Sequence, residues 1–170
     1  VMDLMALGQV MLLPEDDLAL AALLKSPLIG LDDTDLIALA PDRDGSLWQA
    51  LQQAGYATAC LGKWHLGGAG FGPEAQGFQT VQPGQPRSEP TATEGSKGEM
   101  GLAAQAEQFI AAHRDQPFFL YLPHDSPHIP FAATDEGKQK FRDAFNPTYA
   151  AVIESLDASV GRVLAALDAH

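Results

Sequence analysis

The sequence has little cysteine and few basic residues, and each shortage excludes a class of protein. Cys60 is the single cysteine, so an internal disulfide framework is impossible and the redox compartment stays open. Ten Lys and Arg residues face 22 Asp and Glu residues, which gives a formal net charge of −12. Because nucleic-acid affinity comes mainly from Lys and Arg that neutralise phosphates, we expect no nucleic-acid partner.

Long apolar runs are also missing. No run approaches the ~20 residues that a membrane span needs, so we expect no membrane partner. The opening residues VMDLMALGQVMLL lack the basic region and the cleavage site of a signal peptide. The first residue is Val1 instead of methionine, which predicts a piece of a longer chain or a processed one. The sequence does not indicate an oligomeric state.

The remaining composition fits an ordinary globular domain with an α/β fold. Hydrophobic residues make up 46% of the 170 residues. A chain of about 150 residues buries roughly 70% of its unfolded surface, so a real core is possible. Helical and strand patterns alternate, which is typical of a mostly parallel sheet flanked by helices. We expect helices over 18–24, 36–39, 46–54, 100–113 and 147–167, strands over 57–61 and 117–122, and a surface excursion with little regular structure over 71–101.

Local signals fix several of these boundaries. Ser46 and Gln49 form a capping box, and Gly55 suits the position after the helix because glycine tolerates positive φ. Asn146 caps the last helix. Gly161 interrupts its apolar stripe, and we expect it to allow close packing. The strand over 117–122 is apolar without alternation, which predicts that helices cover both of its faces.

The stretch from Gly55 to Gly67 carries the densest chemistry in the chain. Lys63 and His65 follow the predicted strand over 57–61, and residues two apart in an extended segment project to the same side. An ammonium beside an imidazole suits an anionic, tetrahedral group. The alternative is a surface lysine and a histidine that satisfies loop carbonyls.

A second polar cluster follows the strand over 117–122, in a loop with three prolines. In open α/β sheets ligands bind beyond the carboxyl ends of strands, so His124, Asp125 and His128 are candidates for catalysis or substrate binding. Zinc ligation by the two histidines is the alternative, although they do not share a helix face and no third ligand is evident. A purely structural role in the loop is a further one.

The remaining candidates favour structural roles. Cys60 falls inside the predicted strand, where we expect a buried, unreactive thiol, because reactive cysteines lie partly exposed in electropositive surroundings. The pairs Asp16-Asp17 and Asp32-Asp33 look like cation ligands, but acids at helix starts are common because of the helix dipole.

Four stretches in the right order resemble the sulfatases, the arylsulfatase-type enzymes of the alkaline-phosphatase-like superfamily. Gly55 to Gly67 resembles the family's Lys-Trp-His signature at all thirteen positions. Pro73–Phe78 resembles its Pro-x-x-x-Gly-Phe segment, and Pro117–Pro130 its strand and histidine loop. Tyr149–Leu167 resembles the helix with Leu-Asp-x-x-Val-Gly-Arg. Residues 46–169 therefore look like a partial sulfatase catalytic domain, whereas 1–45 diverge.

The resemblance implies a set of roles. In the family, Ca²⁺ and a formylglycine made from cysteine or serine hold the sulfate ester. By resemblance Lys63 binds sulfate and orients the nucleophile, and His65 hydrogen-bonds the formylglycine hydrate. His128 binds sulfate near the leaving oxygen. The implied partner is a sulfated small molecule or a sulfated glycan, and a periplasmic or extracytoplasmic location is usual for the family.

The chain departs from the family at the nucleophile and the metal. No Cys or Ser followed by x-Pro-x-Arg precedes Gly55, and Ser88–Ala92 imitates that motif only in part and on the wrong side. Leu28–Asp33 imitates the family's calcium-binding aspartates but leaves no room for a nucleophile segment before Lys63. We find no calcium ligands in the chain. Groups that act as a unit lose nearly everything when one is removed, so we expect this chain alone to lack sulfatase activity.

Three interpretations remain open. The chain is a fragment of a sulfuric ester hydrolase, or it is a degenerate relative that binds sulfated ligands without hydrolysis. The third keeps the enzyme class and changes the ester, because Lys63 and two histidines do not separate sulfate from phosphate or phosphonate monoesters. The substrate itself is not encoded in any pattern that we can read.

Overall fold

The computed structural model describes residues 5–6, 9–10, 13, 16–27, 29–39, 45–67, 70–84, 89–91 and 95–170. Leu28 of the Leu28–Asp33 stretch and both ends of the Ser88–Ala92 stretch lie outside these residues. The elements in chain order are α2 (Asp17–Lys25), α3 (Asp33–Leu39), α4 (Leu47–Gln53), β1 (Ala57–Gly62), the 3₁₀ helix η1 (Pro73–Gln76), β2 (Thr80–Pro83), α5 (Glu99–Ala112), β3 (Phe118–Tyr121), α6 (Asp135–Lys140) and α7 (Pro147–Asp168).

The local signals confirm the predicted helix boundaries. Ser46 and Gln49 form the capping box at the start of α4, and Gly55 follows that helix with φ of +86°. The side chain of Asn146 accepts a hydrogen bond from the backbone N–H of Tyr149, and Pro147 opens α7. Such local hydrogen bonds depend on a few neighbouring residues, so the sequence alone is enough to locate them.

One parallel sheet contains the three strands, in the order β2-β1-β3. β1 and β2 are parallel, with Ala59 opposite Thr80. The N–H of Ala57 donates to the carbonyl of Pro117, and the N–H of Lys63 donates to that of Pro123, so β1 and β3 also run in the same direction. All six residues of β1 are buried. The α/β class is therefore confirmed.

Two predictions about the sheet were wrong. Residues 71–101 contain η1 and β2, where we expected little regular structure. β2 is short, half-exposed and ends in a proline, so its hydrophobic pattern is too weak to predict a strand. β3 is not covered on both faces, since only Phe119 is buried. Among the described residues β3 lies at the edge of the sheet, which explains its partial exposure.

The chain forms two compact units. The first consists of Val1–Thr58, His65–Gln79 and Gln116–Phe119, and the second consists of Ala59–Trp64, Thr80–Asp115 and Leu120–His170. In the first unit α2 packs against α4. The ring of Trp48 lies edge-on to Phe78 and Phe119, with centroid distances of 5.2 and 5.4 Å.

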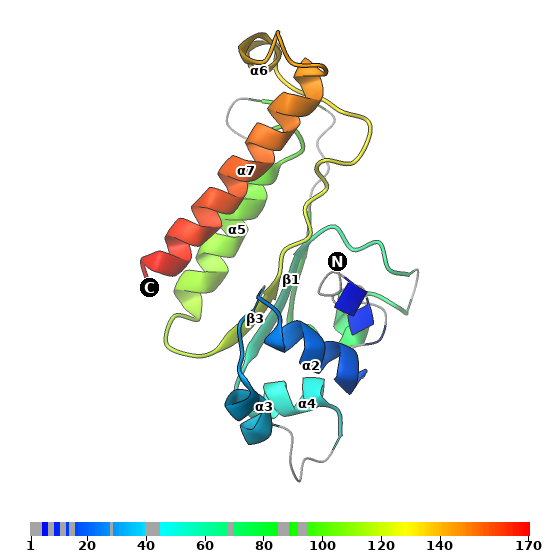
Figure 1. Cartoon of the computed structure of the whole chain (residues 1–170), viewed down its shortest axis with the longest axis vertical. Helices are drawn as coiled ribbons and strands as arrows, with labels where there is room; N and C mark the ends of the chain where they lie inside the picture. Colours follow the sequence, from blue (N-terminus) through cyan, green and yellow to red (C-terminus); the bar gives the residue numbers. More distant parts are fainter. Residues whose placement is uncertain are drawn as a thin grey trace. The chain divides into compact units, whose positions relative to one another are not determined.

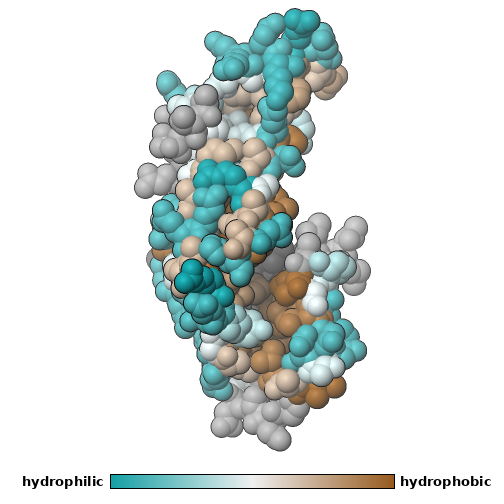
Figure 2. Space-filling view, turned by 90° about the vertical axis from the view of Figure 1, so that its left-hand side faces the viewer, coloured by the Kyte–Doolittle hydropathy of each residue, from teal (hydrophilic) through white to brown (hydrophobic). Residues whose placement is uncertain are grey.

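The second unit contains a long helical pair. α5 and α7 lie side by side, and α6 packs against the start of α7 (Figure 1). Arg162 of α7 binds Glu107 of α5 through two hydrogen bonds of 2.8 and 2.6 Å. On the face shown in Figure 2, most side chains at the end of this unit that carries α6 are hydrophilic. No helix in the described part of the chain is long and apolar enough to cross a bilayer.

The prediction for Gly161 was wrong. α7 continues without a break from Pro147 to Asp168, and a Cβ built on Gly161 meets no atom within 4 Å. Val160 and Leu164 beside it are exposed by 42% and 56%. Nothing in the described structure therefore requires a glycine at this position.

We predict that Gly161→Ala stabilises the protein by about 0.5–1 kcal/mol, because glycine in a helix interior costs about that much relative to alanine. Urea unfolding measures the difference. Gly137→Ala in α6 is the matched control, since its Cβ would lie 3.2 Å from both Ala151 Cβ and Thr134 Oγ1 and gain less. A loss of stability in Gly161→Ala would show that the glycine is needed for close packing.

Candidate active site

A cavity of about 600 Å³ lies in the second unit, beyond the carboxyl ends of the three strands. This is the edge at which α/β sheets bind ligands. The segments after β1, β2 and β3 each contribute to its lining, and the first turn of α5 completes it. The lining residues are Gly62, Lys63, Trp64, Pro83, Gly84, Lys97, Gly98, Glu99, Gly101, Leu102, Gln105, Pro123, His124 and Asp125.

Gly62 brings the segments after β1 and β3 together. Its φ is +125°, and a Cβ at this position would lie 2.2 Å from the carbonyl oxygen of Pro123. Any other residue would therefore combine backbone strain with a steric clash. The close approach lets the N–H of Lys63 donate to the Pro123 carbonyl over 2.9 Å. Lys63 is thereby placed beside the histidine loop that begins at Pro123.

Asp125 lies between two lysines. Lys63 Nζ is 2.8 Å from Asp125 Oδ1, and Lys97 Nζ is 3.3 Å from Asp125 Oδ2. Partial burial on its own raises the pKa of Asp125, but hydrogen bonds from Lys63 and Lys97 and their charges outweigh it and hold that pKa below its usual value. The Asp125 side chain is therefore a carboxylate at neutral pH, balanced by two ammonium groups.

Glu99 is a buried carboxylate, and each of its two oxygens accepts a hydrogen bond. It is 2% exposed. Its Oε1 accepts from the hydroxyl of Ser126, and its Oε2 accepts from the Ser155 hydroxyl over 3.3 Å and from the Lys97 N–H over 2.8 Å. A buried acid needs such partners. Glu99 thus fixes the start of α5 to the histidine loop and to α7.

His124 lines the cavity and is tied to the same network. Its Nε2 lies 2.9 Å from Ser159 Oγ, and the Ser159 hydroxyl donates to the Glu99 carbonyl over 2.9 Å. Because the Ser159 hydroxyl donates its hydrogen to the Glu99 carbonyl, Nε2 of His124 is the donor to Ser159. Burial lowers the pKa of His124, although the backbone of Leu122 and the charge of Glu99 oppose this. The uncharged imidazole is therefore favoured.

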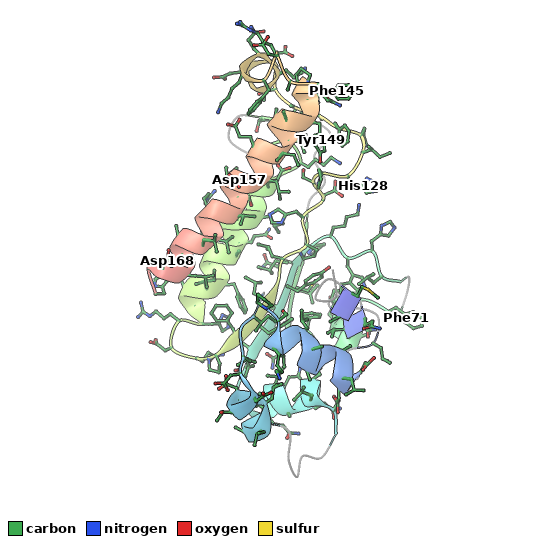
Figure 3. The ribbon with its side chains drawn as sticks, in the orientation of Figure 1. Phe71, His128, Phe145, Tyr149, Asp157 and Asp168 are labelled. Atoms are coloured by element: carbon green, nitrogen blue, oxygen red, sulfur yellow. The ribbon has the colours of Figure 1, made fainter. Side chains whose placement is uncertain are left out.

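The structure brings only part of the predicted site into this cavity. Lys63, His124 and Asp125 line it, whereas His128 is exposed and is not among the lining residues. His128 projects from the loop between β3 and α6 on the side away from α7 (Figure 3). Its Nδ1 lies 2.5 Å from the carbonyl of Ile129, and its own carbonyl accepts from Lys97 Nζ. His65 belongs to the first unit, and its side chain is exposed.

The described residues do not fit a calcium ion or a formylglycine. They contain no group of three or more His, Cys, Asp or Glu side chains that could hold a metal. Asp32 and Asp35 accept each other's backbone N–H groups, and Asp33 pairs with Lys25. Cys60, the single cysteine, is 1% exposed within β1, which places it in the core.

Comparison with known proteins identifies the family. A sulfatase family model matches residues 29–170. The chain belongs to the sulfatase family. The motif resemblance starts at Ser46, and the family match begins upstream of it. The match includes the Lys63 signature, the histidine loop and α7.

Solved structures agree with this sulfatase assignment. The chain is similar to a crystal structure of Ps i-CgsB in complex with k-i-k-neocarrahexaose, with a TM-score of 0.56 and 25% identity over 69% of this chain. A crystal structure of Ps i-CgsB gives a TM-score of 0.56 and 26% identity over the same 69%. The fold is that of the alkaline-phosphatase-like superfamily. The chain spans 35% of the length of each of these structures.

The motif analysis missed Lys97 and Glu99. Both lie at the end of the stretch that we interpreted as a surface excursion, and no motif marks them. A signal was available at Glu99, because an acid at the first position of a predicted helix is favoured by the helix dipole. Its burial, and the pairing of Lys97 with Asp125, depend on the packing of the histidine loop against α5.

We predict that His124 makes the protein less stable at mildly acidic pH. Its pKa is lowered in the folded state, so the unfolded chain binds the proton more readily and stability falls as pH drops below about 6.5, the ordinary histidine value. In His124→Gln the loss of stability between neutral pH and about pH 5 should be smaller than in the wild type. Urea unfolding at a series of pH values measures this.

His113→Gln, at the end of α5 in the same unit, is the control for the loss of a histidine. An identical pH dependence in His124→Gln and the wild type would contradict the inferred environment of His124.

Proposed function

We propose that this sulfatase chain carries the anion-binding part of a sulfate-ester hydrolase site, with Lys63 as the residue that contacts the sulfate group. The observation that carries the proposal is the position of Lys63. It belongs to the Lys-Trp-His signature, follows β1, and lines a cavity at the carboxyl end of a parallel sheet. A fixed ammonium at this edge offsets the negative charge of a sulfate ester and orients it.

The family resemblance supports roles for two further residues, each considered by itself. By resemblance His128 acts near the leaving oxygen of the ester, and His65 near the nucleophile. Neither side chain lines the cavity that contains Lys63. Both side chains are exposed and therefore accessible to a ligand. In the family a formylglycine supplies the attacking oxygen and Ca²⁺ neutralises the sulfate, and the described residues fit neither. We therefore propose that this chain taken alone binds a sulfate ester and does not hydrolyse it.

The proposed ligand is a sulfated glycan. Ps i-CgsB, to which the chain is similar, was crystallised with a sulfated oligosaccharide, k-i-k-neocarrahexaose. The cavity volume of about 600 Å³ falls within the ~300–1,000 Å³ range of small-molecule sites, so it can accept a sulfated sugar unit. The sulfate group is then recognised by Lys63, and the sugar ring packs on the apolar part of the lining.

We predict that Lys63→Ala weakens binding of k-i-k-neocarrahexaose by about tenfold, because it removes one charge-assisted contact worth ~1.4 kcal/mol. Titration calorimetry at fixed ionic strength measures the affinity. Lys138→Ala on α6 is the matched control, since this lysine lies outside the lining, and it should change the affinity less than twofold.

A chemically desulfated hexasaccharide should bind the wild type weakly. Its affinity should not exceed the affinity of the sulfated hexasaccharide for Lys63→Ala. Incubation with an aryl sulfate and Ca²⁺ should give no turnover above Lys63→Ala. Equal affinity for the sulfated and desulfated sugars would refute sulfate recognition. Turnover above the variant would refute the claim that the chain alone does not hydrolyse.

A further inference from the structure

The strongest unexplained feature of the cavity is the pair of lysines on one carboxylate. Asp125 gives one oxygen to Lys63 over 2.8 Å and the other to Lys97 over 3.3 Å. Lys97 also donates to the backbone carbonyl of His128. The Lys97 side chain is 9% exposed, so its ammonium is largely removed from water. A cation so buried needs compensating acceptors, and Asp125 supplies the charged one.

The other charged group of the cavity does not compete for these lysines. The Glu99 carboxylate accepts hydrogen bonds from the hydroxyls of Ser126 and Ser155 and from the backbone N–H of Lys97. Asp125 is therefore the acid that pairs directly with the ammonium groups of both Lys63 and Lys97.

The donors that now bind the Asp125 carboxylate would also bind a sulfate group. Carboxylate and sulfate oxygens both accept charge-assisted hydrogen bonds from ammonium groups. The first turn of α5 lines the same cavity through Gly98, Glu99 and Gly101, and the N-terminus of a 14-residue helix favours an anion. The Asp125 carboxylate thus occupies a position in which these donors would also stabilise a ligand anion.

We propose that Lys97 is a second sulfate-binding residue and that Asp125 is an internal competitor, which a sulfate group displaces from both lysines. This proposal rests on the proposed function, in which Lys63 contacts the sulfate. It adds that a ligand must offer an anionic group that takes the place of the Asp125 carboxylate at both ammonium groups. A neutral or weakly charged sugar does not displace Asp125, whereas a sulfated sugar does.

The proposal predicts opposite effects at neighbouring residues. Asp125→Asn removes the competitor and should bind inorganic sulfate about tenfold more tightly than the wild type. Lys97→Met removes a ligand cation and should bind it about tenfold more weakly, while Lys97→Arg should retain most of the affinity. A purely structural role of the Asp125 bridge predicts instead that both Asp125→Asn and Lys97→Met weaken binding.

The experiment is an NMR titration of the full chain with sodium sulfate, in which chloride holds the ionic strength constant. The amide signals of Gly62 and Lys63 report on the cavity, and the dispersion of the whole spectrum shows that each variant is folded. Asp168→Asn, at the exposed end of α7 (Figure 3), controls for the loss of a negative charge. Lys138→Met controls for the loss of a positive charge.

If Lys97→Met does not fold, the double variant Asp125→Asn/Lys97→Met replaces it, because it leaves no unpaired charge at this position. The double variant should bind sulfate more weakly than Asp125→Asn alone. Equal binding by the two would overturn the role of Lys97.

The outcomes separate this proposal from the function on which it rests. Tighter sulfate binding in Asp125→Asn, dependent on Lys97, supports the proposal even if no sulfated sugar binds. Unchanged or weaker sulfate binding in Asp125→Asn overturns it, even if Lys63→Ala still weakens binding of the sulfated sugar. Failure of the wild type and of Asp125→Asn to bind inorganic sulfate at all overturns this proposal, whereas the proposed function stands or falls with binding of the sulfated sugar.

Discussion

The site depends on the close approach of two backbone segments at Gly62. Its positive φ and the missing Cβ let the end of β1 reach the carbonyl of Pro123, which follows β3. This contact places Lys63 beside Asp125, on a sheet edge that already favours ligand binding. Without it, the lysine of the Lys-Trp-His signature and the histidine loop would be two separate surface features.

A second constraint fixes the opposite wall of the cavity. Glu99 opens α5 and is buried against Ser126 of the histidine loop and Ser155 of α7. Ser159, also on α7, links the Glu99 carbonyl to His124. The long helix whose Leu-Asp-x-x-Val-Gly-Arg pattern marks the sulfatase family thus holds the histidine loop in place.

The sequence predicted those parts of the fold that local hydrogen bonds determine. The capping box at Ser46, the glycine at Gly55 and the cap at Asn146 each involve a few neighbouring residues, and all three are present. β2 escaped prediction because its strand character comes from pairing with β1, not from its own pattern. Gly161 was misread because close packing depends on what faces the helix.

The candidate site was predictable to a similar extent. Motif spacing identified Lys63 and the loop that contains His124, Asp125 and His128, and the structure places three of these four residues in the cavity. Spacing alone does not show that His124 faces the cavity while His128 faces solvent, because that depends on the path of a proline-rich loop. Lys97 is far from both motifs in sequence, so only the folded chain shows its contact with Asp125.

In the function that we propose, the cavity beyond β1 and β3 binds sulfate through Lys63. The most direct test is a crystal structure of the chain with k-i-k-neocarrahexaose. We expect a sulfate oxygen within hydrogen-bond distance of Lys63 Nζ, inside the cavity, with the Lys63–Asp125 ion pair broken. A sugar bound elsewhere, with that ion pair intact, would contradict it.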